Sequence, residues 1–138
     1  MNAVDTNILL YSIDAVDPTK QLKAQLLLLQ LKQSTEHSYL LWQVLGESFH
    51  QLRRWRVQNK LSLSEYEHHS FALRSLFPLV LPTEEVLDRA LAIAERYSVS
   101  HWDSMLLGAC QAAGISTLYT EDMGAPRFID GINLINPF

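Results

Sequence analysis

The sequence predicts an α/β domain with a mainly parallel central sheet and helices on both of its faces. Short apolar segments typical of buried strands alternate with longer segments of helical periodicity along the 138 residues. The chain is 48 % hydrophobic and 19 % charged, which suits a globular domain with a substantial core. We therefore expect a single three-layer α/β/α domain over residues 1–138.

The composition argues against a membrane or disulfide-bonded protein. The N-terminus has no basic segment followed by a long apolar one, and the longest run of leucines, 26–29, is far too short to span a bilayer. The single cysteine, Cys110, excludes an intramolecular disulfide and is compatible with a reducing compartment. We expect a soluble, cytoplasmic protein that has no membrane partner.

The N-terminal third predicts a very short strand and a helix. Ala3-Val4 is a brief apolar run near the start of the chain. Residues 20–32 carry leucines at helical spacing and others that widen the apolar face. These leucines are Leu22, Leu26, Leu27, Leu28, Leu29 and Leu31. A face of that width predicts burial on more than one side, either in the core or in a homodimer.

The middle of the chain predicts a strand and two helices. Residues 38–43 are short and apolar, and they indicate a buried strand that leads into a helix from about Val44. Ser62 or Ser64 can begin the next helix, which runs to about Phe77.

A second strand and an amphipathic helix follow. Residues 78–82 predict a strand that begins and ends with proline. Thr83 is the expected N-cap of the next helix, and the two glutamates after it favour the helix dipole. The expected buried stripe of this helix is Val86, Ala90, Ile93 and Tyr97.

The C-terminal part predicts one helix and two further strands. Ser100 can cap a helix whose interior, residues 105–113, is apolar nearly all round, and Gly114 ends it. Strands are expected at 117–120 and 132–135, with a loop containing glycine and proline between them.

Acidic side chains follow two of the predicted strands. Asp5 comes directly after Ala3-Val4, and Glu121-Asp122 follows the apolar run 118–120. If both strands are parallel members of one sheet, these acids collect at the same edge. Neighbouring carboxylates raise each other's pKa and cost stability unless a divalent cation offsets their charge. The sequence therefore predicts a metal site, although adjacent strand residues face opposite ways and leave open which of Glu121 and Asp122 faces it.

Five segments in this order resemble a PIN-domain protein, in particular the VapC-like ribonuclease toxins of bacterial toxin–antitoxin pairs. They are Val4-Asp5-Thr6-Asn7, Glu47 in the helix after the second strand, Ser100-His101-Trp102-Asp103, Leu118-Tyr119-Thr120-Glu121-Asp122-Met123 and Asn136-Pro137-Phe138. The likeness spans the whole chain, and it lies in the joint order and spacing of the segments.

The resemblance implies a three-layer PIN-like domain and a metal-dependent endoribonuclease restrained by a small cognate antitoxin. It implies a catalytic and metal-binding set around Mg²⁺ or Mn²⁺ that comprises Asp5, Glu47, Asp103 and Asp122. Thr6, Asn7 and Thr120 match polar positions that orient ligands or phosphate. Metal-activated water would hydrolyse RNA phosphodiester bonds without a nucleophilic side chain.

The charge distribution is compatible with an RNA partner despite a net charge of −4. Without the four implied site acids, the chain has 11 acidic and 11 basic residues. Four basic residues fall within eight positions, and they are Arg53, Arg54, Arg56 and Lys60. This group predicts a phosphate-binding patch, although a solvated helix face explains it equally well.

The individual acids also have structural interpretations. Asp103 lies three residues after Ser100, where a capping-box acid stands, and Glu47 viewed alone is an ordinary helix glutamate. Asp5 is harder to explain structurally, because an acid directly after a buried strand needs a partner.

Two alternative functions are open at this point. Glu47 with His50, and Glu65 with His68, have the i, i+3 spacing of the Glu-x-x-His pairs in di-iron carboxylate helical bundles. Such a bundle does not use the strand-like segments. The second alternative keeps the PIN-like fold in a non-catalytic RNA-binding protein.

Overall fold

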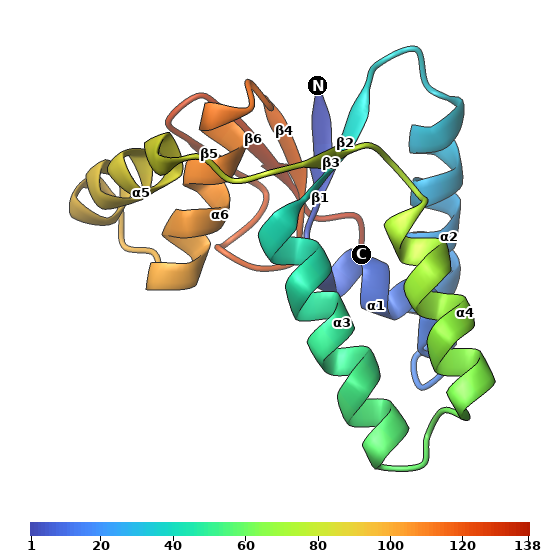
Figure 1. Cartoon of the computed structure of the whole chain (residues 1–138). Coiled ribbons are helices and arrows are strands. Elements are labelled where there is room, and N and C mark those ends of the chain that lie inside the picture. The colour runs from blue at the N-terminus through green and yellow to red at the C-terminus, as the bar shows by residue number, and fades with distance from the viewer.

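Six strands form one sheet in the order β3-β2-β1-β4-β6-β5 in the computed structural model, which describes residues 1–138 (Figure 1). The strands are β1 (Asn2–Val4), β2 (Ser38–Leu41), β3 (Leu79–Val80), β4 (Thr117–Tyr119), β5 (Arg127–Ile129) and β6 (Ile132–Ile135). The helices are α1 (Thr6–Ile13), α2 (Pro18–Gln33), α3 (Trp42–Val57), α4 (Leu63–Arg74), α5 (Glu84–Arg96) and α6 (His101–Ala112). The predicted α/β class with a mainly parallel sheet is confirmed.

The strand order reverses at β1. The chain continues from β1 to β2 and β3 on one side, whereas β4 and β6 lie on the other. All of these pairs are parallel, and only β5 runs antiparallel, against β6. The place where the order of a parallel sheet reverses leaves a crevice at the carboxyl ends of the central strands. In this chain, that crevice lies at the ends of β1 and β4.

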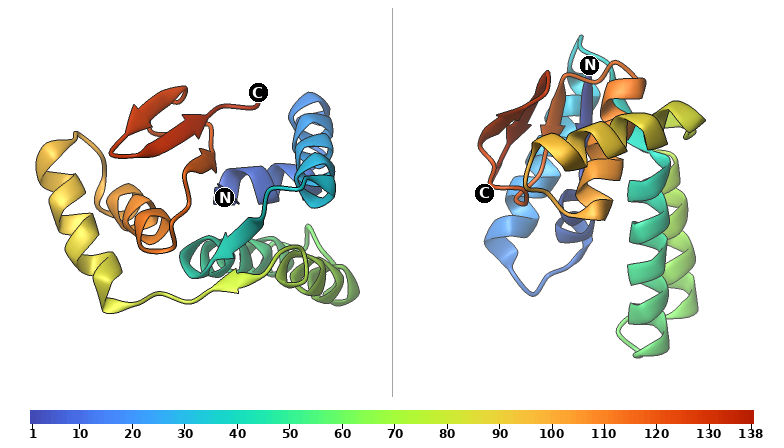
Figure 2. Two further views of the ribbon diagram at one scale, coloured as in Figure 1. Left: turned by 90° about the horizontal axis from the view of Figure 1, so that it is seen from above. Right: turned by 90° about the vertical axis from the view of Figure 1, so that its left-hand side faces the viewer.

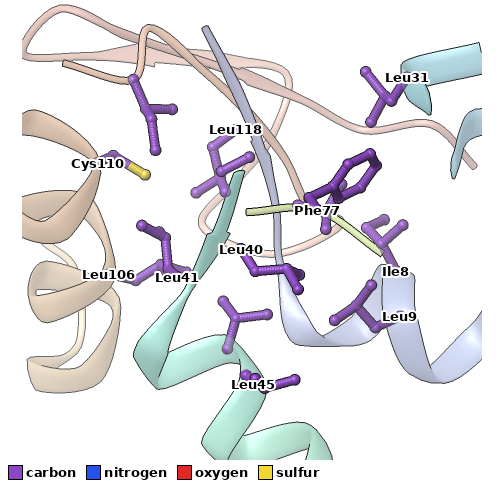
Figure 3. Close-up of a cluster of buried hydrophobic side chains, with 14 of the residues drawn as sticks. Ile8, Leu9, Leu31, Leu40, Leu41, Leu45, Phe77, Leu106, Cys110 and Leu118 are labelled. Carbon is purple, nitrogen blue, oxygen red and sulfur yellow. The ribbon is translucent and has the colours of Figure 1, made fainter. Parts of the chain in front are cut away.

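Helices cover both faces of the sheet. Helices α1 and α2 lie on one face and α6 lies on the other, with α5 packed on α6 (Figures 1 and 2). Side chains from β2 and β4 meet α6 on one side, and the core continues to α1 on the other (Figure 3). Labelled members of this core are Ile8, Leu9, Leu40, Leu41, Leu106, Cys110 and Leu118. Because a layer of helices covers each face of the sheet, its short apolar strands are buried on both sides.

Most predicted elements are present with shifted ends. The helix expected from Val44 begins at Trp42, directly after β2. Ser62, rather than Ser64, caps α4 through a complete capping box with Glu65, and the helix ends at Arg74. The strand expected over 78–82 shortens to the two residues of β3.

Two elements escaped prediction. Helix α1 was not predicted because Asp5 was interpreted only as a site acid, yet the Asp5 side chain accepts a hydrogen bond from the Thr6 amide and acts as the N-cap of α1. Strand β5 lies in the segment expected to be a loop, where it pairs with β6 as an antiparallel edge strand.

The wide apolar face of α2 divides into two parts. Ala24, Leu27, Leu28 and Leu31 are buried in the core. Leu22, Leu26 and Leu29 are more than half exposed and form an outer leucine stripe. The core thus buries three of the six leucines that were predicted to be buried, and the other three remain exposed. None of the six helices combines the length and apolar character that crossing a bilayer requires.

A close approach of α5 and α6 predicts the effect of a single methyl group. A Cβ at Gly108 would lie 2.7 Å from the Val86 carbonyl oxygen and 3.0 Å from the Ala90 amide nitrogen. Because both neighbours are backbone atoms, Gly108→Ala should destabilise the fold by about 1–3 kcal/mol, measured by urea unfolding.

Gly46→Ala is the matched control, since Gly46 also lies inside a helix but has nothing within 4 Å of its Cβ position. This change should raise the free energy of unfolding by about 0.5–1 kcal/mol. Equal effects of the two substitutions would show that helix propensity, and not the contact of α5 with α6, decides the cost at Gly108.

Candidate functional site

Polar side chains from three strand ends meet at the crevice beside β1 and β4. Asp5 follows β1 directly, and Thr120 and Asp122 follow β4. Glu47 lies in α3, which begins where β2 ends. We call this group, together with Thr6 and Asn7 of α1, the acidic site.

Asp5 is the most buried acid of the site. It is 7 % exposed, and its Oδ1 accepts a 2.6 Å hydrogen bond from the Thr6 amide. Its Oδ2 accepts a 2.7 Å bond from the hydroxyl of Thr120, which is fully buried. The Asp5 amide donates to the Tyr119 carbonyl at 2.9 Å, so the pairing of β1 with β4 continues to the site. Both the backbone and the carboxylate of Asp5 are therefore fixed.

Asn7 and Thr120 connect Asp5 to Asp122. Asn7 Nδ2 donates to Asp122 Oδ2 at 2.9 Å and to Asp5 Oδ2 at 3.5 Å. The Thr120 hydroxyl, which donates to Asp5, also accepts from the Asp122 amide at 3.0 Å. Two carboxylates from distant parts of the chain thus share one amide group. Asn7 Oδ1 is buried without a hydrogen-bond partner, so an oxygen acceptor is left over at the same place.

The environment of Asp5 disfavours its charged form. The pKa of the Asp5 carboxyl rises from its usual 3.8 to about 6, and burial is the main cause. Hydrogen bonds from Thr120 and Thr6 lower this pKa, whereas the negative charges of Asp122 and Glu47 raise it. A positive charge at the site would offset both the cost of burying the charged carboxylate and its repulsion by the other acids.

Glu121 and Asp122 are adjacent but face different partners. Glu121 forms an ion pair with Lys20 of α2 and accepts a hydrogen bond from the Tyr11 hydroxyl. Burial raises the pKa of Glu121, but Lys20 and Tyr11 outweigh it and hold that pKa below its usual range. Glu121 is therefore neutralised inside the protein, and Asp122 is the acid that faces Asp5.

Glu47 belongs to the same network through hydroxyl and amide donors. The Thr6 hydroxyl donates to Glu47 Oε2 at 2.9 Å, and Gln43 Nε2 donates to Glu47 Oε1 at 2.9 Å. Gln43 Nε2 also donates to the Trp102 carbonyl at 3.1 Å, which ties the start of α3 to the start of α6. Glu47 is exposed, so its carboxylate is accessible from solvent while its orientation is set.

Asp103 lies in the first turn of α6, next to Trp102, but does not join the hydrogen-bonded network. Its amide donates to the Ser100 hydroxyl at 3.1 Å, which is the N-cap bond of α6. Its carboxylate makes no hydrogen bond back to the Ser100 amide, in contrast to the complete box of Ser62 and Glu65. Capping therefore explains the position of Ser100 and leaves the Asp103 carboxylate without a structural partner.

The donor set has the character of a hard-cation site. No three His, Cys, Asp or Glu side chains form a group that would hold a metal ion by themselves. The site offers oxygen atoms, with two carboxylates joined by Asn7. Mg²⁺ is commonly bound by one or two carboxylates while it retains waters and contacts substrate phosphate. The residues present fit such an ion better than a closed cage for zinc.

The three arginines of the predicted basic patch divide over two faces of α3, and Lys60 lies beyond the end of this helix. Arg54 follows Glu47 by seven residues, which is about two helical turns, so the two lie on one face. Arg53 and Arg56 instead line a hollow with Tyr66 of α4. The patch lies at the end of the α3–α4 hairpin that is remote from the sheet (Figure 1). Of these three arginines, only Arg54 therefore lies on the face of α3 that carries Glu47 of the acidic site.

The arrangement excludes the di-iron bundle considered for the sequence. Six strands occupy the segments that such a bundle does not use. Glu47 lies in the sheet-side half of α3, whereas Glu65 lies in the first turn of α4, at the remote end of the hairpin (Figure 1). The two Glu-x-x-His pairs therefore do not meet.

Several residues near the acids were missed as functional candidates. Gln43 orients Glu47, and its position one helical turn before Glu47 was the available signal. Lys20 and Tyr11 neutralise Glu121, but they are distant in sequence, so no local pattern indicated them.

Comparison with known proteins shows the same fold in bacterial toxins. A toxin–antitoxin complex from Klebsiella pneumoniae is similar with a TM-score of 0.71 and 18 % identity, over 100 % of this chain and 98 % of that chain. VapC20 of Mycobacterium tuberculosis, a toxin that cleaves the sarcin–ricin loop, is similar with a TM-score of 0.69 and 16 % identity, over 96 % of this chain and 99 % of that chain. VapBC2 from Rickettsia felis, bound to a DNA fragment from its promoter, is similar with a TM-score of 0.69 and 14 % identity, over 96 % of each chain.

A search of curated protein sequences found no significant match. The PIN domain family, however, matches residues 3–128, a stretch that includes every member of the acidic site and Asp103. The chain therefore belongs to the PIN-domain family.

Proposed function

We propose that this protein is a metal-dependent endoribonuclease toxin that a small cognate antitoxin restrains. The observation that carries the proposal is the pair of carboxylates, Asp5 and Asp122, joined by Asn7 at the point where the strand order reverses. Membership of the PIN-domain family and the likeness to structures described as toxins support the same activity.

The residues fit Mg²⁺, with Mn²⁺ as the alternative ion. Asp5 and Asp122 would hold it, and Glu47 and Asp103 would bind its waters or a second ion. The buried, unpartnered Asn7 Oδ1 supports this assignment, because a metal-bound water would supply the missing donor. The chemistry supplied by a bound cation is activation of water for in-line attack on phosphorus and stabilisation of the leaving oxygen.

The remaining polar residues hold the acids in place for this reaction. Thr120 fixes Asp5 through its hydroxyl, and Asn7 aligns Asp122 with Asp5. Thr6 orients Glu47 through its hydroxyl. The Thr6 hydroxyl and the Asn7 amide would bind a phosphate of the substrate by exchanging their bonds to Glu47 and to the two aspartates for bonds to phosphate oxygens. Since water is the nucleophile in this scheme, the RNA products carry 5′-phosphate and 3′-hydroxyl ends.

An inhibitor is part of the proposal because a free ribonuclease degrades the RNA of its own cell. An arginine or lysine of the antitoxin would pair with the site carboxylates and displace the metal. The outer leucine stripe of α2 would bind an amphipathic helix of the antitoxin or serve a homodimer.

The direct test incubates the purified protein with single-stranded and structured RNAs and Mg²⁺ or Mn²⁺, with a chelator control, and maps the ends produced. Metal-dependent internal cleavage with 5′-phosphate ends is the expected result. Binding without cleavage would favour a non-catalytic RNA-binding protein instead.

Loss of any one site carboxylate should abolish cleavage in a folded protein. Asp5→Asn, Asp103→Asn and Asp122→Asn each remove charge that holds the metal, and each should lower the cleavage rate by about 100-fold or more. Circular dichroism would verify the fold. Full activity of Asp5→Asn would refute the catalytic assignment.

Glu121→Gln is the matched control for Asp122→Asn, because Glu121 is the adjacent acid and is occupied by Lys20 and Tyr11. It should retain most of the activity. The reverse ranking of the two variants would exchange the roles assigned to these residues.

The raised pKa of Asp5 predicts a distinctive dependence of stability on pH. The folded protein keeps a proton on Asp5 up to about pH 6, whereas the unfolded chain loses it near 3.8. The folded state therefore binds more protons between these values, and stability falls as pH rises through them. At about 1.4 kcal/mol per pH unit, the loss reaches roughly 3 kcal/mol.

Asp5→Asn should lack this loss. In metal-free buffer, the free energy of unfolding of the variant should therefore increase relative to that of the wild type as the pH rises from about 4 to about 6. Urea unfolding at a series of pH values measures the difference. Mg²⁺ at neutral pH should raise the Tm of the wild type more than that of the variant. Parallel pH curves for the two proteins would contradict a charged Asp5 buried at this site.

Expression in a bacterium should reveal the antitoxin. The wild type alone should arrest growth, Asp5→Asn should not, and co-expression with the short protein encoded beside it should restore growth and allow the two to be purified together. Harmless high-level expression of the wild type in a cell without such a partner would count heavily against the toxin assignment.

A further inference from the structure

Two exposed tryptophans stand beside the acidic site. Trp42, the first residue of α3, is 55 % exposed, and Trp102, in the first turn of α6, is 63 % exposed. Both line one open cleft of about 540 Å³, which we call the tryptophan cleft. Its lining residues are Trp42, Gln43, Gly46, Glu47, His50 and Trp102. An acid of the site and two indole rings thus share one surface depression.

A second, more apolar cavity adjoins the tryptophan cleft. It has a volume of about 300 Å³ and shares Trp42, Gln43 and Trp102 with the cleft. Most of its other lining residues are hydrophobic, including Val80, Leu81 and Met105. The size and apolar lining are those of a pocket for one small ring system.

Gln43 connects the tryptophan cleft to the acids. Its Nε2 donates both to Glu47 and to the carbonyl of Trp102, so the amide holds the two helix starts together. Neither bond uses Oε1, which is free to accept a hydrogen bond from a bound group. The cleft therefore combines aromatic faces with one oriented acceptor, next to a carboxylate of the site.

We propose that the tryptophan cleft is a nucleobase subsite, in which an unpaired base of the RNA stacks on Trp42 or Trp102 while its phosphate lies at the acidic site. This inference rests on the proposed ribonuclease activity. No lysine or arginine lines the cleft or the adjoining cavity, so neither is built for phosphate. A base is the planar, uncharged part of RNA that gains from indole stacking and from one hydrogen bond to an amide oxygen.

The proposal defines the substrate class. A base inside an A-form duplex is stacked on its neighbours and its edges are poorly accessible, so it cannot enter the tryptophan cleft. The preferred substrate therefore has an unpaired nucleotide, in a loop, bulge or single strand, next to the bond that is cut.

Equilibrium binding in chelator, where no cleavage occurs, tests the subsite. The probe is a labelled, unstructured RNA oligonucleotide of mixed sequence, compared with the same strand carrying abasic sites. At least one of Trp42→Ala and Trp102→Ala should weaken binding of the intact strand by about tenfold, and Trp→Phe at the same position should recover part of the loss. The abasic strand should bind weakly to the wild type and should discriminate little between wild type and variants.

Phe71→Ala is the matched control, because Phe71 on α4 is an exposed aromatic residue outside the tryptophan cleft. It should leave RNA affinity unchanged. Stacking is not ionic, so the tryptophan variants should keep the salt dependence of the wild type. Arg54→Ala should instead flatten it, by roughly 0.7 in log–log slope for a lost phosphate contact.

The possible results separate the two proposals. If the wild type neither binds nor cuts RNA, the ribonuclease assignment and the subsite fail together. If it cuts RNA and the folded alanine variants bind intact RNA like the wild type, only the subsite is overturned. If these variants instead lower the molecular mass in analytical ultracentrifugation and leave RNA affinity unchanged, the tryptophan cleft is an interface between copies of the chain.

Discussion

The parallel pairing of β1 with β4 is the constraint on which the site depends. It brings residues 5 and 120, far apart in the sequence, to the same edge of the sheet, and the Asp5 amide extends the pairing by donating to Tyr119. The carboxylate of Asp5 is thereby buried, and its hydrogen bonds from Thr6 and Thr120 do not fully compensate, since its pKa still rises to about 6. At neutral pH the folded chain holds a charge that its own structure disfavours. Stability and site geometry are therefore opposed at this residue, which is the usual condition of a functional site.

The protein treats its two adjacent acids in opposite ways. Glu121 is matched by Lys20, whose ammonium also lies 4.5 Å from the ring centre of Tyr11 and 5.3 Å from that of Phe138. Tyr11 and Phe138 in turn pack edge to face, with ring centres 5.1 Å apart. This cluster ties the segment after β4 to α1 and α2. Asp122 forms no ion pair within the chain, so its negative charge is not neutralised and lies next to Asp5.

The sequence allowed the sheet and the acids to be predicted, because both depend on local patterns. Apolar runs bounded by turn residues located β2, β4 and β6, and acids after strands located the site edge. What was missed depends on partners distant in the chain. Helix α1 was hidden because Asp5 was interpreted as a site acid only, although one carboxylate both caps the helix and faces Asp122. The choice between Glu121 and Asp122 needed Lys20, which is about a hundred residues away in the sequence. Likewise, four basic residues close in sequence appeared to be one patch until the 100° step of the helix separated Arg53 and Arg56 from Arg54.

Two helix starts border the acidic site, and each places a tryptophan near an acid. Helix α3 begins with Trp42 and presents Glu47, while α6 begins with His101-Trp102 and presents Asp103. Gln43 joins the two starts with a single amide nitrogen. On the proposed function, Gln43 therefore holds one acid of the site, Glu47, and one tryptophan of the base subsite, Trp102, with the same nitrogen. Because Trp102 and Asp103 are adjacent in the first turn of α6, a change that tilts α6 against α3 moves both of them relative to Glu47.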